Sequence, residues 1–178
     1  MQVGLEKNHF ELFGLPLRFD IDGADLSVRY RNLQRHFHPD RYASGSDQQR
    51  RLALQMTANI NEAFQTLKDP LTRGRYILAL LGVSTDEETD TVMDPAFLMA
   101  QMELRESMQE ARAAPDQPQR LPALMRDVEQ RLTLGTEELG RRLNENTATS
   151  LARARSLVRE MQFLRKVQRE IEDLEQFE

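Results

Sequence analysis

The chain has 178 residues, of which 24 are Lys or Arg and 29 are Asp or Glu, so its formal net charge is −5. Hydrophobic residues make up 39% and charged residues 30%, which is typical of a folded globular protein rather than a disordered tail. The sequence has no cysteine, which excludes disulfides, thiolate-bound zinc, cysteine-ligated iron–sulfur clusters and cysteine nucleophiles. Leu occurs 25 times against 7 Val and 4 Ile, and this composition favours a mostly helical protein.

The distribution of apolar and charged residues predicts the cellular location of the protein and its division into modules. No stretch approaches the roughly 18 apolar residues that span a bilayer, and the N-terminus lacks the features of a signal peptide, so we expect a cytoplasmic protein. Residues 1–80 hold 11 basic and 9 acidic groups, whereas residues 81–178 hold 13 and 20. Two halves of opposite net charge indicate two modules with different partners.

The first two predicted helices are bounded by glycine and proline. Residues 8–17 predict a helix of one or two turns, which Gly14 and Pro16 close. A second helix starts near Ala24 and ends before Pro39, since proline disfavours helical geometry in the residue before it. Its apolar residues recur at steps of three and four and form one stripe: Leu26, Tyr30, Leu33 and Phe37.

Two further helices complete the first module, which we place at residues 1–81. A third helix follows a polar loop at 43–47 and breaks at Asp69-Pro70, and a short fourth helix spans 73–81. The apolar stripe of the third helix consists of Leu52, Met56, Ile60, Ala63, Phe64 and Leu67. Residues 82–94 hold five acids and four Ser or Thr, so they predict a linker.

Residues 95–178 predict an antiparallel three-helix bundle. Asp94-Pro95 is typical of an N-cap followed by a first-turn proline, and the helix that it opens runs to about Ala113. After a loop at 114–118, a long helix runs from Leu121 with a weak point at Gly135. The next turn covers 144–149, and a last helix continues almost to the C-terminus. Three amphipathic helices joined by short turns can bury their stripes only against one another.

The strongest local motif is His38-Pro39-Asp40, which follows a helix with several exposed arginines. Three other interpretations are open for it. The turn could simply end a helix, with His38 capping the last carbonyls. A metal site of His36, His38 and Asp40 is disfavoured, because ligands at i and i+2 diverge on a helix and no third cluster exists. Nucleic-acid binding is disfavoured because this half of the chain carries only +2.

Four segments in the expected order resemble a J-domain, the module by which DnaJ-type co-chaperones stimulate the ATPase of heat-shock chaperones. They are residues 30–33, 38–41, 60–64 and 69–73, and the resemblance covers residues 8–80. It implies a helical hairpin whose His-Pro-Asp turn contacts the chaperone ATPase, with arginines that attract and orient an acidic groove. The implied ATPase-binding residues are His38, Pro39, Asp40, Arg29, Arg31, Arg35 and Arg41, the last replacing a lysine of many members.

The helix from Pro95 has a second apolar face besides its core stripe. At about 100° per residue, one stripe gathers the residues expected to pack in the bundle: Phe97, Leu104, Met108 and Ala111. Roughly opposite lie Leu98, Met99 and Met102, interleaved with Glu103, Glu106 and Glu110. Exposed apolar groups ringed by charge indicate a protein-binding patch, although a wide core or the first module could also cover them. In the last helix, Phe163 also lies off the main stripe.

The order of J-domain, acidic linker and three-helix bundle resembles the HscB family, the co-chaperones of bacterial iron–sulfur cluster assembly. The opening of the bundle, residues 94–99, matches that family, and the resemblance extends over essentially the whole chain. It implies an all-α, L-shaped protein whose J-domain engages the chaperone HscA and whose bundle binds the scaffold IscU. The implied scaffold-binding residues are Leu98, Met99, Met102, Glu103, Glu106, Glu110 and Phe163, with Met102 replacing a leucine.

These observations predict an adaptor rather than an enzyme. No catalytic residues, bound metal, cofactor, nucleic acid or membrane are expected, because the sequence shows no nucleophile–base spacing, phosphate loop or metal-ligand set. The zero cysteine count predicts a protein that handles clusters through its partners and ligates none itself. Two alternatives stay open at this point: a J-domain co-chaperone that delivers a different client, and weak self-association.

Overall fold

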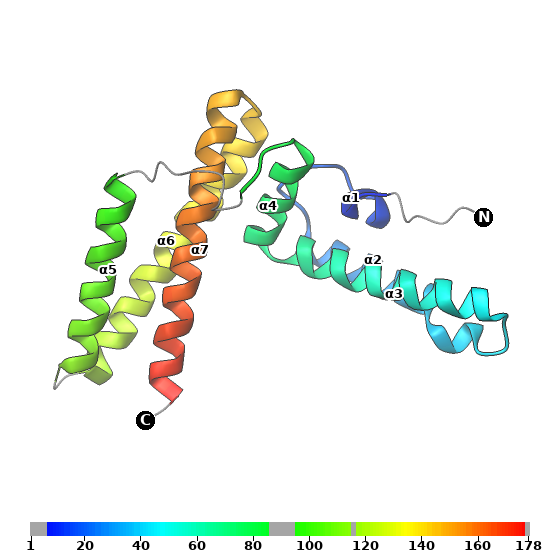
Figure 1. The fold of residues 1–178 in the computed structure, drawn as a ribbon, viewed down its shortest axis with the longest axis horizontal. Helices are drawn as coiled ribbons and strands as arrows, with labels where there is room; N and C mark the ends of the chain where they lie inside the picture. Colours follow the sequence, from blue (N-terminus) through cyan, green and yellow to red (C-terminus); the bar gives the residue numbers. More distant parts are fainter. Residues whose placement is uncertain (1–6, 86–94, 115–116, 177–178) are drawn as a thin grey trace. The chain divides into compact units, whose positions relative to one another are not determined.

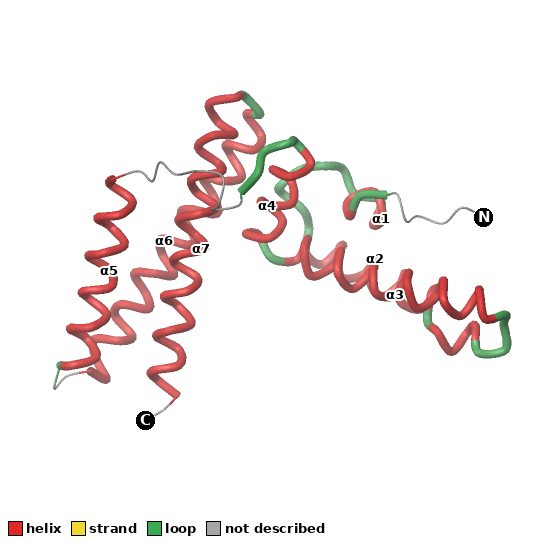
Figure 2. The backbone as a smooth tube through the Cα atoms, in the orientation of Figure 1, coloured by secondary structure: helices red, strands yellow, loops and turns green. Residues whose placement is uncertain are grey.

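In a computed structural model of the chain, residues 7–85, 95–114 and 117–176 are described, and within these ranges every regular element is a helix (Figures 1 and 2). The chain divides into two compact units, Met1–Ile77 and Leu78–Glu178. In chain order they are α1 (His9–Phe13), α2 (Gly23–Phe37), the 3₁₀ helix η1 (Pro39–Tyr42), α3 (Asp47–Lys68), α4 (Pro70–Leu80), α5 (Pro95–Ala113), α6 (Gln117–Glu145) and α7 (Ala148–Gln176).

An antiparallel hairpin of α2 and α3 forms the body of the first unit (Figure 1). Its core residues are almost fully enclosed: Leu26, Met56, Ile60, Ala63 and Leu67. The stripe predicted for the third helix, α3, therefore faces inward, except that Leu52, near its loop end, keeps 37% of its surface exposed. The short helix α1 adds Phe10 and Phe13 to this core, and Gly14 ends it in the left-handed conformation with φ at 64°.

A polar and aromatic contact between α2 and α3 fixes how the two helices align. The ring of Tyr30 stacks on that of Phe64 with centroids 4.1 Å apart, and the Tyr30 hydroxyl donates to Asn61 Oδ1 at 2.9 Å. Gln34 donates through Nε2 to both the Tyr30 hydroxyl and Asn61 Oδ1. Two of the segments that resemble a J-domain thus meet in space, and their shared residues align the hairpin.

The end of α3 is closed by side chains from the start of α4. Thr72 donates through Oγ1 to the Thr66 carbonyl at 2.8 Å, and Arg73 donates through Nη1 to the Leu67 carbonyl at 2.6 Å. The Arg73 guanidinium is almost fully buried and lies 4.8 Å from the ring centroid of Phe19. The helix α4 begins at Pro70, three residues before the predicted start, because proline suits the first turn of a helix.

Three helices, α5, α6 and α7, make up most of the second unit, and the described part of each matches the predicted bundle (Figures 1 and 2). The two longest helices, α6 and α7, pack most closely, and α5 contacts both of them. Buried apolar residues line their shared surface, among them Leu121, Val128, Leu139, Val158 and Ile171. The predicted N-cap Asp94 and most of the predicted linker, residues 86–94, lie outside the described residues.

Two boundaries of the predicted bundle are wrong. The predicted loop at 114–118 is too long, because α6 begins at Gln117. The predicted turn at 144–149 is too long, because only Asn146 and Thr147 lie outside the helices. Asn146 takes a left-handed φ of 49°, and Thr147 caps α7 through reciprocal hydrogen bonds with Ser150. Gly135, the predicted weak point, lies within the continuous helix α6. A Cβ at that position would lie 3.2 Å from Met161 Cγ, so the glycine permits close contact between α6 and α7.

No helix within the described ranges combines the length and the apolar character needed to cross a membrane.

We predict that His9 makes the stability of the first unit depend on pH. Its ring stacks on Tyr76 with centroids 4.2 Å apart, and burial lowers the imidazole pKa below its usual value, while the Glu62 carboxylate opposes part of that shift. The folded state therefore favours neutral His9. Stability from this group is complete above the unfolded pKa of about 6.5 and is lost as the pH falls from there through the lower folded pKa.

Replacement of His9 by Phe keeps a ring beside Tyr76 and removes the titration. Urea unfolding of the full chain, followed by circular dichroism at several pH values between about 5 and 7.5, measures the effect. The free energy of unfolding should fall more steeply with decreasing pH in the parent protein than in His9→Phe. Parallel curves for the two proteins would contradict the assignment.

Candidate functional site

The His38-Pro39-Asp40 turn lies on the surface between α2 and α3 and is held by hydrogen bonds of its own. His38 ends α2 and also starts η1, with φ at −56° and ψ at 128°. Its Nδ1 accepts the backbone N–H of Asp40 at 3.3 Å and lies 3.5 Å from the Asp40 carboxylate. A neutral imidazole that accepts at Nδ1 carries its proton on Nε2. The Asp40 side chain is 90% exposed, so the turn presents one carboxylate and one N–H donor to solvent.

Three side chains close the last carbonyls of α2 behind this turn. The Arg35 carbonyl accepts from Arg41 Nη1 at 3.3 Å, and the His36 carbonyl accepts from the Tyr42 hydroxyl at 3.4 Å. The Phe37 carbonyl accepts from Thr57 Oγ1 of α3 at 3.1 Å. Pro39 has no N–H with which to cap the helix, so these side chains supply the missing donors. The turn is therefore anchored to both arms of the hairpin.

The four predicted arginines do not form one group. Arg31 and Arg35 lie one turn apart on α2 and are both exposed, and Arg41 is exposed beside the turn. Arg29 lies about 200° from Arg31 around the helix, on a different face. It pairs with Asp25 at 2.8 Å and donates through Nη1 to the Phe13 carbonyl at 3.0 Å, which ties α1 to α2. The structure gives Arg29 a contact role inside the unit.

His36 and His38 do not combine with Asp40 into a metal site. Within residues 7–85, 95–114 and 117–176, no three His, Cys, Asp or Glu side chains gather closely enough to hold a metal ion.

In the second unit, α5 carries a solvent-facing surface of two methionines and three glutamates. Met99 and Met102 keep 63% and 71% of their surface exposed, and the glutamates beside them are exposed as well: Glu103, Glu106 and Glu110. These five residues recur at steps of three and four, so they share one face of the helix, which we call the methionine face. Leu98, 39% exposed, borders it. The predicted second apolar face of this helix is therefore exposed within its own unit.

Phe163 belongs to α7 and contacts the side of α5 that faces away from the methionine face. Its ring meets that of Phe97 at right angles, with centroids 6.2 Å apart. Met99 lies about 200° around the helix from Phe97, so Phe163 and the two exposed methionines are on opposite sides. The structure brings together the predicted residues of α5 but does not bring Phe163 beside Met99 and Met102.

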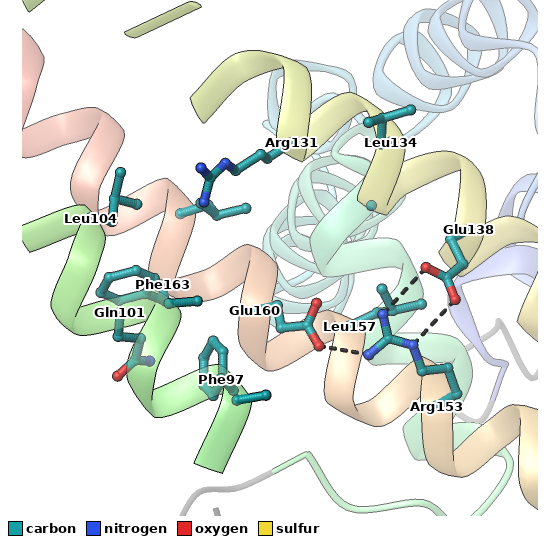
Figure 3. Close-up of a pocket in the computed structure, with 14 residues that line it drawn as sticks. Phe97, Gln101, Leu104, Arg131, Leu134, Glu138, Arg153, Leu157, Glu160 and Phe163 are labelled. Atoms are coloured by element: carbon teal, nitrogen blue, oxygen red, sulfur yellow. Dashed lines mark hydrogen bonds and ion pairs between the residues drawn. The ribbon is translucent and has the colours of Figure 1, made fainter. Parts of the chain in front are cut away.

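Phe163 instead lines a groove of about 410 Å³ between α5, α6 and α7 (Figure 3). Figure 3 shows apolar side chains from all three helices along it, including Phe97, Leu104, Leu134, Leu157 and Phe163. The residues that line the groove come from α5 on one side and from the closely packed pair of α6 and α7 on the other.

A network of charges closes one end of the groove (Figure 3). Arg153 donates to Glu138 at 3.2 and 3.3 Å and to Glu160 at 2.6 Å. The hydrogen bonds from Arg153 hold the Glu138 pKa below its usual value despite partial burial. Burial works to lower the pKa of Arg153, but the hydrogen bonds to Glu138 and Glu160 outweigh it and raise that pKa. Glu138 and Arg153 are therefore both charged, and their hydrogen bonds hold α7 against α6.

Sequence reasoning missed two kinds of residue here. Tyr42 and Thr57 support the His-Pro-Asp turn, and the only signal for them is that Pro39 must leave helix carbonyls uncapped. Arg153 and its two glutamates lie on separate helices or turns of a helix, so no local spacing could reveal their shared contact.

The sequence and the fold were compared with those of known proteins. The family model of the HSCB C-terminal oligomerisation domain matches residues 93–172. A co-chaperone HscB homologue from Burkholderia multivorans is 41% identical over 169 residues, 95% of this chain and 94% of that protein. The solved structure of chaperone HscB from Vibrio cholerae gives a TM-score of 0.84 at 39% identity, covering 96% of this chain and 98% of that one. The crystal structure of human co-chaperone HscB gives a TM-score of 0.86 at 26% identity, covering 96% of this chain and 83% of that one.

A helical hairpin with an exposed His-Pro-Asp turn is typical of a J-domain co-chaperone, and in this chain a three-helix unit follows it. Among co-chaperones of this class, HscB homologues are 40–41% identical to this chain over 94–95% of its length. The chain belongs to the HscB family of co-chaperones. The resemblance inferred from the sequence is confirmed.

We predict that Thr57 stabilises the end of α2 beneath the turn. Replacement of Thr57 by Val keeps the shape of the side chain and removes the donor to the Phe37 carbonyl, which is partly buried. The free energy of unfolding should fall by about 1 kcal/mol. Ser27→Ala is the control, because the Ser27 hydroxyl also donates to a helix carbonyl but lies exposed on α2. Equal stabilities of Thr57→Val and Ser27→Ala in urea titrations would contradict this role.

Proposed function

We propose that the protein is a non-enzymatic adaptor that binds the iron–sulfur scaffold IscU and stimulates the ATPase of the chaperone HscA. In this role it would assist cluster transfer and the maturation of iron–sulfur proteins. The single observation that carries the proposal is the pairing, in one chain, of an exposed His-Pro-Asp turn with an exposed methionine face in a separate unit. Membership of the HscB family supports it.

The geometry of the first unit supports a chaperone contact at the His-Pro-Asp turn. Asp40 offers an acceptor-only carboxylate and His38 offers a donor, in positions fixed by the capped end of α2. Arg31 and Arg35 lie on the adjoining exposed face and supply charge that attracts and orients an acidic partner. This combination suits recognition, since both side chains are exposed on the surface.

The methionine face of α5 supports binding of the scaffold. Unbranched thioether side chains adapt to irregular partner surfaces, and the surrounding glutamates exclude partners of like charge. Because Phe163 lies in the groove, we assign the main contact to Leu98, Met99 and Met102, and Phe163 supports α5 through Phe97. This assignment narrows the set inferred from the sequence.

The two units act together because one chain carries both. A scaffold bound to the second unit stays close to the chaperone that the first unit engages, which raises its effective concentration there. Contact at His38 and Asp40 would then couple docking to ATP hydrolysis, which traps the scaffold on the chaperone. The adaptor itself forms and breaks no covalent bond. The alternative is a J-domain co-chaperone that carries a different client on the same methionine face.

We predict that His38→Gln abolishes most ATPase stimulation and leaves scaffold binding unchanged. The substitution removes the imidazole that organises the turn through its Nδ1 contact with Asp40. Stimulation of HscA turnover should fall roughly tenfold or more, equivalent to about 1.4 kcal/mol of lost coupling. The affinity for IscU, measured by calorimetry, should stay within error of the parent value.

His36→Gln is the matched control, because His36 is an exposed histidine two residues earlier, outside the hydrogen bond that joins His38 to Asp40. It should stimulate HscA as well as the parent does. A simultaneous loss of stimulation and IscU affinity in His38→Gln would argue against an adaptor with separate sites.

We predict that replacing Leu98, Met99 and Met102 together by Ala weakens IscU binding. Interface anchors cost about 1 kcal/mol or more each on truncation, so the combined loss should be roughly 100-fold in affinity. The helical spectrum should persist, because the three side chains are exposed. Leu54→Ala, which alters an exposed leucine in the first unit, should bind IscU as the parent does. Undiminished binding by the triple variant would refute the assignment of this face.

A further inference from the structure

The described methionines differ sharply in how much of their surface is exposed. Met99 and Met102 keep 63% and 71% of their surface exposed. Met56 and Met161, in the two cores, keep 0% and 3%. Met108, about three turns along α5 from Phe97 and on the same side, is half-buried. Among the described residues, the two most exposed methionines therefore lie side by side, one turn apart, on the methionine face.

Their accessibility matters because a thioether is oxidised where an oxidant can reach it. Hydrogen peroxide transfers one oxygen atom to the sulfur: the O–O bond breaks, an S–O bond forms, and the second oxygen leaves as water. The sulfur loses two electrons, the peroxide gains them, and methionine becomes methionine sulfoxide. The product is polar and chiral, and methionine sulfoxide reductases can reverse it. With no cysteine in the chain, thiol oxidation does not compete for the peroxide.

We propose that Met99 and Met102 are sites of reversible oxidation by peroxides, and that their oxidation weakens client binding. The proposal rests on the proposed function for its second half. Oxidation places two polar sulfoxides at the centre of the apolar contact and next to Glu103 and Glu106. A partner that buries Met99 and Met102 must then desolvate these oxygens without gaining apolar contact. The same two side chains that adapt to a client thus make its binding sensitive to the oxidant level.

The first measurement concerns the site alone. The full-length protein is exposed to hydrogen peroxide, and the oxidation of each methionine is followed over time by mass spectrometry of its peptides. Met99 and Met102 should oxidise roughly tenfold or more faster than Met56 and Met161, because solvent reaches only the first pair. Equal rates for the exposed and the buried methionines would overturn the site.

The second measurement concerns binding. After the peroxide is removed, affinity for IscU is measured on untreated, oxidised and reductase-repaired protein. Oxidation should lower the affinity roughly tenfold, the equivalent of losing one well-buried side chain from the contact, and repair should restore it. The double variant Met99→Leu/Met102→Leu is compared with itself: its affinity for IscU, whatever its value before treatment, should be the same after treatment. Met108→Leu, the control on the same helix, should stay as sensitive as the parent.

The outcomes separate the oxidation site from its effect on binding. If untreated protein does not bind IscU, the proposed function fails and the effect on binding fails with it, while the oxidation rates still decide the site. If untreated protein binds IscU but oxidised protein binds equally well, the proposed function stands and the effect of oxidation is refuted. Loss of binding in the treated leucine variant would assign the effect to other methionines and overturn the proposal.

Discussion

The first unit depends on one backbone constraint, the placement of proline directly after a helix end. Pro39 follows α2 and Pro70 follows α3, and neither can donate the N–H that would cap the last carbonyls. Side chains beyond each proline supply the donors instead. Because these donors belong to the next helix in the chain, each helix end is fixed relative to its successor. The donor side chains are those of Arg41 and Tyr42 after Pro39, and those of Thr72 and Arg73 after Pro70.

This constraint explains how a surface turn keeps a defined geometry without a core beneath it. His38 and Asp40 are exposed, so apolar packing contributes little to holding them. The hydrogen bonds to the end of α2 hold them locally, and Thr57 adds one from α3. The second unit uses a different balance. There α6 and α7 pack closely at Gly135. The helix α5 borders the groove on one side and exposes its methionine face to solvent on the other.

Much of the architecture could be predicted from the sequence, because the signals that bound its helices are local. Gly14, Pro39 and the amphipathic stripes predicted the described helices, and the His-Pro-Asp motif predicted the turn. Contacts between helices far apart in sequence could not be predicted in this way. Gly135 lies against Met161 of α7, and Phe163 faces a groove whose other walls come from helices far away in sequence. Spacing along one helix carries no information about such contacts.

The proposed function places two unlike kinds of recognition in one chain. The His-Pro-Asp turn offers directional groups, a fixed carboxylate and an imidazole, whose interaction falls steeply when the geometry changes. The methionine face offers adaptable apolar surface, whose interaction depends on area more than on direction. A site that triggers ATP hydrolysis must respond to one arrangement only, so rigidity suits it. A site that holds and then releases a client gains from adaptability, and it needs no rigid frame. The capped end of α2 and the solvent-exposed face of α5 meet these two requirements separately.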